Sequence, residues 1–198
     1  MDAKQILREV FGYEAFRGGQ EPLIRSILSG RDTLGIMPTG AGKSLCYQVP
    51  ALAMEGITVV VSPLISLMKD QVEALIQAGV PAAYLNSSLT PTQFQKAMER
   101  TRAGAYKILY AAPERLGKES FLSFAKEAEI SMVCVDEAHC VSQWGQDFRP
   151  SYRRIPELIR ALSKRPVVSA FTATATAQVR DDIVRLLELS DPFVLTTG

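Results

Sequence analysis

The chain has 198 residues, of which 47% are hydrophobic and 22% are charged, and its formal net charge is +1 at pH 7. These values are typical of one soluble globular domain with a sizeable core, and they exclude global disorder. A net charge this small indicates no partner by itself, so any nucleic-acid binding must come from a local patch of charge.

The first thirty residues are predicted to be helical. Residues 2–11 carry apolar side chains at helical spacing behind Asp2, a candidate N-cap. Residues 21–30 form a second short helix, with Pro22 near its start and Gly30 just past its end. Glycines between the two segments interrupt the helical pattern.

From residue 32 onward, short apolar segments alternate with longer amphipathic ones. The apolar segments predict strands at residues 32–37, 57–62, 82–86, 106–111, 130–137, 166–173 and 192–197. Helices are expected at residues 42–54, with a bend or an end near Pro50, and at residues 64–79, 91–104, 155–164 and 176–189. Residues 114–128 are predicted to be helical or irregular.

Strands that are apolar throughout and alternate with helices indicate a mostly parallel sheet with helices on both faces. The sequence contains no internal repeat, low-complexity segment or linker. We therefore expect a single α/β domain over residues 1–198, with the helical segment 1–30 packed on it.

The three cysteines, Cys46, Cys134 and Cys140, form no CxxC pair, and the chain has one histidine. This pattern predicts neither a disulfide framework nor a structural metal, and it favours a reducing, cytoplasmic setting. The first residues lack the layout of a signal peptide, and the longest apolar runs are too short to cross a bilayer. No membrane partner is expected.

The segment MPTGAGKS, residues 37–44, follows a predicted strand and opens a predicted helix, which is the context of a phosphate-binding loop. Backbone amides between small residues and a helix N-terminus favour phosphate. The expected phosphate-binding residues are Thr39, Gly40, Ala41, Gly42, Lys43 and Ser44.

Within this loop, Lys43 is expected to reach the outer phosphates, and the Ser44 hydroxyl is expected to hold Mg²⁺. The general pattern GxxxxGK[ST] has glycine where this chain has Met37, and Ala41 disfavours positive φ. A chance glycine-rich turn between a strand and a helix is therefore an alternative.

Asp136 and Glu137 come at the end of the predicted strand 130–137, the edge at which open α/β sheets bind ligands. Asp136 is expected to hold Mg²⁺ through water, and Glu137 to orient and deprotonate an attacking water. A solvated acidic turn is the alternative for this pair alone. Together with the phosphate loop, the two carboxylates predict nucleotide hydrolysis.

Several segments resemble the motifs of a known family. MPTGAGKS, DEAH (136–139) and SAFTATAT (169–176) resemble motifs I, II and III of the superfamily-two helicases, which accept a residue other than glycine at Met37. FGYEAFRGGQ (11–20) and DEAHCVSQWGQDFRPSY (136–152) resemble motif 0 and the aromatic-rich loop of RecQ-type DNA helicases. VVVSPLISLMKDQV (59–72) and LYAAPERL (109–116) resemble motifs Ia and Ib of that family.

This resemblance implies a RecA-like P-loop NTPase fold with ATP and Mg²⁺ as cofactors. By the same resemblance, Tyr13 and Arg17 sandwich adenine, and Gln20 hydrogen-bonds its edge, chemistry that suits a ring, a guanidinium and an amide. Phe11 and Phe16 are expected to pack only. His139 is expected to contact the nucleotide and relay its state.

The implied DNA-binding or coupling residues lie in three motifs. They are Ser62, Pro63 and Lys69 in motif Ia, Gln143, Trp144, Phe148 and Arg149 in the aromatic-rich loop, and Thr172 and Thr174 in motif III. Trp144 and Phe148 offer faces for unpaired bases, each worth about 1–3 kcal/mol. A small satellite core is the alternative for these two aromatic residues, and apolar filling of a strand is the alternative for the two threonines.

Two further features concern the same region. The family often has histidine where Gln146 stands, so the strength of coupling is open at this position.

Six basic residues and one acidic residue lie between Arg149 and Pro166. A solvated helix face is the expectation for several of these basic residues, and salt-sensitive phosphate contacts for others.

The resemblance implies that the chain is the first motor domain of an ATP-dependent DNA helicase of DNA repair and recombination that translocates 3′ to 5′. Its partners would be single-stranded and partially duplex DNA and a C-terminal RecA-like domain of the same protein. Because that second domain supplies the arginine finger, we expect the isolated chain to bind ATP weakly, hydrolyse it poorly and unwind no DNA. The expected location is the cytoplasm, on the nucleoid if the source is bacterial. An RNA helicase, a nucleotide-dependent switch without motor activity and a DNA-binding module with an inactive site are the alternatives.

Overall fold

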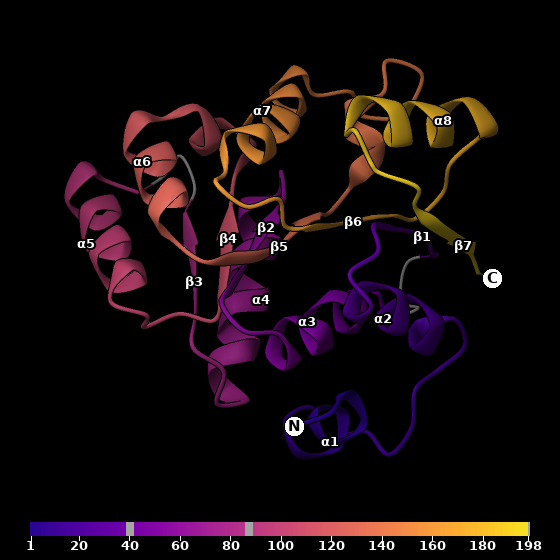
Figure 1. Ribbon diagram of the computed structural model, residues 1–198, viewed down its shortest axis with the longest axis horizontal. Helices are drawn as coiled ribbons and strands as arrows, with labels where there is room; N and C mark the ends of the chain where they lie inside the picture. Colours follow the sequence, from indigo (N-terminus) through magenta and orange to yellow (C-terminus); the bar gives the residue numbers. More distant parts are fainter. Residues whose placement is uncertain (39–41, 86–88, 198) are drawn as a thin grey trace.

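A computed structural model describes residues 1–38, 42–85 and 89–197. Within these ranges, seven strands form one sheet in the order β3-β4-β2-β5-β6-β1-β7 (Figure 1). The strands are β1 Thr33–Ile36, β2 Ile57–Val61, β3 Ala82–Leu85, β4 Ile108–Ala111, β5 Ile130–Val135, β6 Val167–Thr172 and β7 Phe193–Thr196. Every neighbouring pair is parallel. The predicted parallel α/β architecture is confirmed, and each predicted strand is present.

Helices form a layer on each side of the sheet (Figure 1). One layer contains α2 Gln20–Leu28, α3 Lys43–Ala53 and α4 Ile65–Gln77, and the other contains α5 Pro91–Arg102, α6 Glu119–Glu127, α7 Arg154–Ala161 and α8 Ala177–Leu186. Successive side chains of a strand point to opposite faces of the sheet, so each strand contributes to both cores. Val59 and Val61 pack under α5–α8, whereas Val60 packs under α2–α4. Short 3-10 turns are η1 Pro113–Gly117, η2 Ala138–Val141 and η3 Pro150–Arg153.

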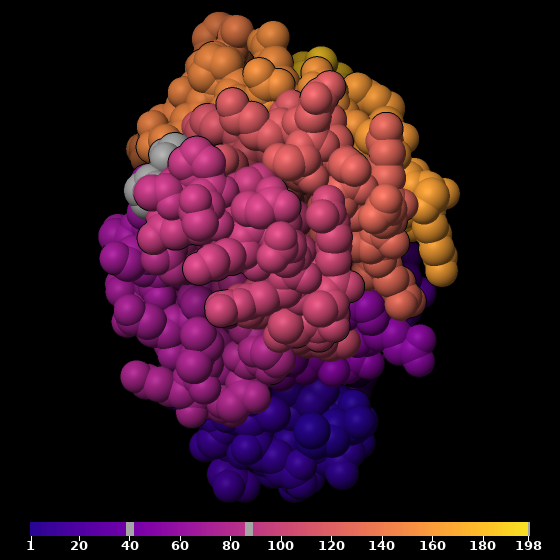
Figure 2. Space-filling model, turned by 90° about the vertical axis from the view of Figure 1, so that its left-hand side faces the viewer, coloured from indigo at the N-terminus to yellow at the C-terminus, as the bar shows by residue number. Residues whose placement is uncertain are grey.

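Helix α1 Ala3–Glu9 lies outside these layers and packs on α2 and α3. Ile6 and Leu7 of α1 form a small third core with Ile24 and Val49. In the space-filling view, this indigo N-terminal segment forms one end of the molecule, beyond the surface built by α5 and α6 (Figure 2). Helix α1 is therefore joined to α2 and α3 by a small apolar interface.

Local chemistry explains where several helices begin and end. Asp2 caps α1 through the backbone N–H of Gln5, as predicted. Helix α3 was expected to bend or end near Pro50, but it continues to Ala53. A proline this close to a helix end removes one hydrogen bond, and the backbone N–H of Met54 still bonds the Pro50 carbonyl. None of the helices in the described ranges has the length and apolar character needed to cross a bilayer.

The strand order determines where the functional site forms. Strand β5 lies between β2 and β6, and β6 pairs with β1. Because all four strands are parallel, the segments that follow them leave at the same edge of the sheet. The phosphate loop, motif Ia, the DEAH segment and motif III therefore meet there.

Candidate nucleotide and DNA site

The phosphate loop connects β1 with α3. The backbone N–H of Met37 donates to the Thr172 carbonyl at 2.9 Å, and the Met37 side chain is fully buried against Cys46. The residue that departs from the general pattern is thus part of the core. Lys43 and Ser44 open α3 and are half-buried. The expected phosphate contacts of Thr39, Gly40 and Ala41 lie outside the described residues.

Gly42 is the N-cap of α3 and has a left-handed backbone, with φ at +78°. A Cβ atom there would lie 2.3 Å from Nε2 of Gln20, so the position needs glycine for both its conformation and its contact. The same Gln20 Nε2 donates to the Gly42 carbonyl at 3.2 Å. The residues resembling motif 0 therefore touch the phosphate loop directly.

A small pocket of about 130 Å³ lies at this contact, lined by Tyr13, Ala15, Arg17, Gln20, Gly42 and Leu45. The three residues expected to bind adenine therefore surround one cavity. Tyr13 is 47% exposed, and its ring is open to a ligand. Gln20 is buried, and its Oε1 accepts from the Arg17 backbone N–H at 2.8 Å. Phe11 and Phe16 pack against the core around α1.

The two candidate catalytic carboxylates follow β5 directly. The strand ends at Val135, two residues before the predicted end, because Glu137 has a left-handed backbone with φ at +52°. Such a conformation costs of order 1–3 kcal/mol in a residue other than glycine and must be held by its surroundings. The Glu137 N–H donates to Oδ1 of Asp136 at 2.9 Å, and the Asp136 N–H donates to the Val61 carbonyl at 2.9 Å.

Asp136 lies in an environment that disfavours its charge. Burial, and then the neighbouring charge of Glu137, raise the pKa of Asp136 from 3.8 to about 6, against the opposing effects of a backbone hydrogen bond and of Lys43. A half-buried carboxylate close to Lys43 is a suitable ligand for a divalent cation. Ser44 and Asp136 therefore fit a Mg²⁺ that arrives with a nucleotide.

His139 joins the DEAH turn to motif III. Its Nδ1 lies 2.8 Å from Oγ1 of Thr172, and its Nε2 lies 3.6 Å from Oε2 of Glu137. The Thr172 hydroxyl also donates to the Thr174 carbonyl at 3.2 Å. An apolar strand residue at position 172 would provide neither contact. The role of both threonines in coupling stays a prediction.

One cleft connects the candidate catalytic residues Glu137 and His139 with the aromatic-rich loop. It has a volume of about 560 Å³ and is lined by Glu137, His139, Trp144, Gly145, Gln146, residues 173–176 and Val179. A Cβ atom at Gly145 would lie 2.7 Å from the His139 carbonyl oxygen, so the loop backbone packs closely on the DEAH turn. Trp144 is 69% exposed, which does not fit the satellite-core alternative for this residue.

The base of the aromatic-rich loop is anchored by contacts that the sequence analysis did not anticipate. The buried Ser142 hydroxyl donates to Asp182 of α8 at 2.8 Å and accepts from the Trp144 backbone N–H at 3.1 Å. The Tyr152 hydroxyl donates to the Asp136 carbonyl at 2.7 Å. A serine and a tyrosine in a loop are too common for sequence to single them out. Gln143 is exposed and Phe148 is half-buried.

The motif Ia residues follow β2, next to the DEAH strand. Ser62 is buried, and its hydroxyl lies 3.5 Å from the Leu64 backbone nitrogen, so it supports its own loop. Pro63 is half-buried, and Lys69 lies exposed on α4. The role of these three residues in DNA binding stays a prediction.

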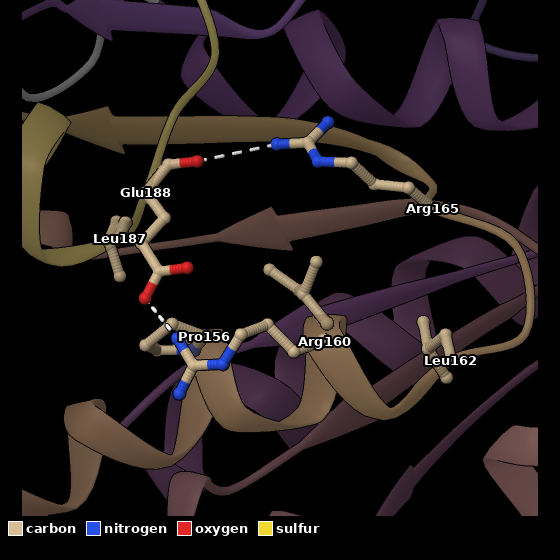
Figure 3. A pocket seen from close by; sticks show the side chains of 7 residues that line it. Pro156, Arg160, Leu162, Arg165, Leu187 and Glu188 are labelled. Carbon is tan, nitrogen blue, oxygen red and sulfur yellow. Dashed lines mark hydrogen bonds and ion pairs between the residues drawn. The ribbon is translucent and has the colours of Figure 1, made fainter.

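Three of the six basic residues from Arg149 to Arg165 are paired with acidic partners. Arg149 bonds Asp147 at 3.0 Å, Arg160 pairs with Glu188, and Arg165 pairs with Asp32 at 2.7 Å. Figure 3 shows Arg160 and Arg165 on either side of Glu188, around a cavity of about 170 Å³. This cavity lies near the amino ends of β6 and β7, away from the carboxyl edge that carries the candidate site.

No cluster of three or more His, Cys, Asp or Glu side chains that could hold a metal occurs in the part of the chain that the structure describes. The three cysteines are free and buried.

Comparisons with known proteins relate this chain to helicases. Residues 17–183 match the family model described as DEAD/DEAH box helicase. The chain is 50% identical over 197 residues to the ATP-dependent DNA helicase RecQ of Bacillus subtilis (strain 168), and 50% identical over 192 residues to that of Pasteurella multocida (strain Pm70). These alignments cover 99% and 97% of this chain but only 33% and 30% of the relatives. The chain thus spans about a third of the length of the curated relatives it matches.

Solved structures show the same fold at low identity. The helicase MrfA bound to DNA matches with a TM-score of 0.78 and 18% identity, over 100% of this chain and 29% of that one. Mss116p bound to single-stranded RNA and AMP-PNP matches with a TM-score of 0.76 and 21% identity, over 98% of this chain and 42% of that one. The sheet and its helices are therefore those of a helicase RecA-like domain.

Proposed function

This chain belongs to the DEAD/DEAH box helicase family, and from that membership we propose that it is the first motor domain of an ATP-dependent DNA helicase of the RecQ type. It binds Mg-ATP and single-stranded DNA. Hydrolysis drives translocation and unwinding only together with a second RecA-like domain. The 3′ to 5′ direction and a role in DNA repair and recombination rest on the resemblance to RecQ-type helicases.

One observation carries this proposal. Glu137 and His139 share a single cleft with Trp144, an exposed aromatic side chain in a loop that packs on the DEAH turn. A base stacked on Trp144 would lie in the same cleft as the group that activates water. DNA binding and hydrolysis are coupled in this arrangement because the loop backbone packs directly on the DEAH turn at Gly145 and His139.

The residues present suit a bound Mg-nucleotide. Tyr13, Arg17 and Gln20 surround the pocket for adenine, and Lys43 and Ser44 open the helix beside the phosphates. When bound, Mg²⁺ neutralises charge on the phosphates and stabilises the transition state. Ser44 and Asp136 would hold the ion, and Glu137 would orient and deprotonate the attacking water.

Hydrolysis by the 198-residue chain alone is expected to be poor. In other phosphoryl-transfer systems, an arginine finger is worth about 10³–10⁵ in rate, and a second domain supplies that arginine in this proposal. The relatives are about three times as long as this chain, which leaves room for such a domain. We place the protein in the cytoplasm, on the nucleoid if it is bacterial.

Two other functions keep the same nucleotide site. An RNA helicase is disfavoured by the similarity to RecQ through the aromatic-rich loop, although the fold itself also occurs in a protein bound to RNA. A nucleotide-dependent switch without motor activity would bind ATP but show no effect of DNA on turnover. Competition between single-stranded DNA and RNA of the same length separates the first alternative from our proposal.

The decisive experiment is displacement of a fluorescent Mg-ATP analogue from this chain by unlabelled ATP and then by GTP. Displacement by ATP and not by GTP is expected, because the Gln20 amide can pair with both N7 and N6–H of adenine, whereas the same edge of guanine presents two acceptors. Equal displacement by both nucleotides would contradict the adenine site at Tyr13, Arg17 and Gln20. Lys43→Ala should abolish binding of the analogue, and unchanged affinity of this variant would overturn the phosphate site.

A further inference from the structure

We infer that Tyr152 is a positioning residue. It would transmit a displacement of the aromatic-rich loop, caused by bound DNA, to Glu137 through the carbonyl of Asp136. This inference rests on the proposed function, because it concerns coupling between DNA binding and hydrolysis. Tyr152 contacts neither the cleft nor the adenine pocket described above. Its effect on the reaction would be indirect, through the backbone of the DEAH segment.

The peptide between Asp136 and Glu137 determines where the Glu137 carboxylate lies. Its N–H is held by Oδ1 of Asp136, and its carbonyl accepts the hydroxyl of Tyr152 at 2.7 Å. Glu137 on the far side of this peptide has the left-handed backbone, a conformation that persists only when neighbouring contacts enforce it. Of these two contacts, the one from Tyr152 comes from sixteen residues further along the chain.

Tyr152 is also part of the returning arm of the loop. It lies in η3, and its backbone N–H donates to the Arg149 carbonyl at 3.0 Å. Arg149 in turn donates its backbone N–H to the Cys140 carbonyl at 2.8 Å. Displacement of Arg149 by a bound phosphate would therefore move the backbone that carries the Tyr152 ring.

The Tyr152 hydroxyl is suited to a hydrogen bond with the Asp136 carbonyl that persists as pH changes. The side chain is fully buried, and burial, followed by the nearby Cys140, raises the pKa of Tyr152 well above its ordinary value. The hydroxyl therefore remains a neutral donor over the working range of pH. A short hydrogen bond inside a rigid core transmits small shifts because close-packed interiors are poorly compressible.

The test measures coupling rather than activity. The dissociation constant of a fluorescent, non-hydrolysable Mg-ATP analogue is determined with and without a saturating oligo(dT) strand, and the ratio of the two constants is the coupling factor. The single Trp of the chain, Trp144, reports DNA occupancy on the loop through its own fluorescence. The wild-type chain should give a factor of about five or more, the lower limit of ordinary allosteric coupling.

Tyr152→Phe removes the hydroxyl and keeps the ring. We expect its coupling factor to fall below about two, while its separate affinities for nucleotide and for DNA stay within about twofold of wild type. Tyr110→Phe is the matched control, because the Tyr110 hydroxyl is also buried and bonded, to Tyr47 and Gln48, but not to the DEAH segment. The control should keep the wild-type factor.

Unchanged coupling in Tyr152→Phe would overturn the inference and leave the proposed function intact. Absence of coupling in the wild-type chain would instead contradict the proposed function. If Tyr152→Phe fails to fold, Pro150→Gly decides the question, since it loosens η3 while keeping the hydroxyl. Full coupling in Pro150→Gly would then overturn the inference, and reduced coupling would support it.

Discussion

His139 and Thr172 lie 2.8 Å apart, imidazole Nδ1 to hydroxyl Oγ1, and join the turn after β5 to the end of β6. A hydroxyl has one proton to donate, and the Thr172 hydroxyl gives it to the Thr174 carbonyl. Its oxygen must then accept from His139. A ring that carries a proton on Nδ1 satisfies this contact, and its Nε2 lies 3.6 Å from Oε2 of Glu137.

The first prediction concerns this tautomer. Because His139 is the only histidine of the chain, its two ring nitrogens can be observed without overlap in a long-range ¹H–¹⁵N NMR spectrum. At pH 8 we expect the form protonated on Nδ1 to dominate. Thr172→Val removes the acceptor and should allow the form protonated on Nε2 to become the major one, as in free imidazole side chains.

Thr174→Val is the control for that experiment, since Thr174 contributes its carbonyl and not its exposed side chain to the contact. Its spectrum should match wild type. A wild-type ring protonated mainly on Nε2 would show that the Thr172 hydroxyl donates to His139 instead, and the expected direction of the relay would be wrong.

The second prediction follows from the raised pKa of Asp136, about 6 in the folded chain against 3.8 in its ordinary state. The folded state binds this proton more tightly than the unfolded state. Protonated Asp136 therefore adds to the free energy of unfolding below pH 4, and this contribution is lost as pH rises to about 6. Asp136→Asn is neutral at every pH. It should therefore raise the free energy of unfolding by about 1–3 kcal/mol at pH 8, and the gain should vanish below pH 4.

Urea unfolding at several pH values checks this result, with Asp70→Asn on the exposed surface of α4 as a control that should change little. Mg²⁺ together with a nucleotide should stabilise the wild-type chain and not Asp136→Asn. A variant that is equally or less stable than wild type at pH 8 would show that Asp136 is not strained by its burial.

The third prediction concerns Gln20, which is bonded both to Arg17 and to Gly42 of the phosphate loop. Gln20→Ala leaves a backbone N–H and a carbonyl without these partners and opens a buried gap. We expect a loss of about 1–3 kcal/mol in the free energy of unfolding, together with a weaker preference for ATP over GTP. Gln93→Ala removes an exposed capping amide instead and should leave nucleotide preference unchanged.

Thermal unfolding and the displacement assay measure the two effects separately. A Gln20→Ala chain that keeps full preference for ATP would mean that Gln20 only supports the phosphate loop. In that case the adenine pocket would depend on Tyr13 and Arg17 alone.

Much of the fold follows from the sequence because periodicity and burial act locally. Fully apolar segments such as 57–62 predicted buried parallel strands, and glycines such as Gly79 predicted helix ends. The expectation that Lys43 and Asp136 lie at one edge followed from the rule that parallel strands present their carboxyl ends together. Pro50 was less informative, because α3 continues through it to Ala53 although proline removes a helical hydrogen bond.

The strand order and the contacts between distant residues could not be obtained in this way. No local pattern places β5 between β2 and β6, and nothing in the chain marks Gln20 as a partner of Gly42 or Tyr152 as a partner of Asp136. These contacts depend on the packed chain as a whole. The basic residues 149–165 give another example. Arg165 pairs with Asp32, which lies 133 residues away in the chain, and no local pattern in the sequence indicates this pair.

The last prediction tests that distant pair. Asp32 is buried, and its carboxylate accepts from the backbone N–H groups of Val168 and Ser190 and from both terminal nitrogens of Arg165. It thereby ties the segments at the amino ends of β6, β1 and β7. Asp32→Ala leaves the Val168 and Ser190 N–H groups without this acceptor, and Arg165 keeps only its contacts with the Pro166 and Glu188 carbonyls. The change should lower the free energy of unfolding by about 3–5 kcal/mol, measured by urea titration. Glu21→Ala breaks only an exposed pair with Arg25 and should cost less than about 1 kcal/mol.

Affinity for Mg-nucleotide should be unchanged in Asp32→Ala under conditions where it is folded, because the site lies at the opposite edge of the sheet. A cost as small as that of Glu21→Ala would show that the backbone of these strands holds its place without the carboxylate.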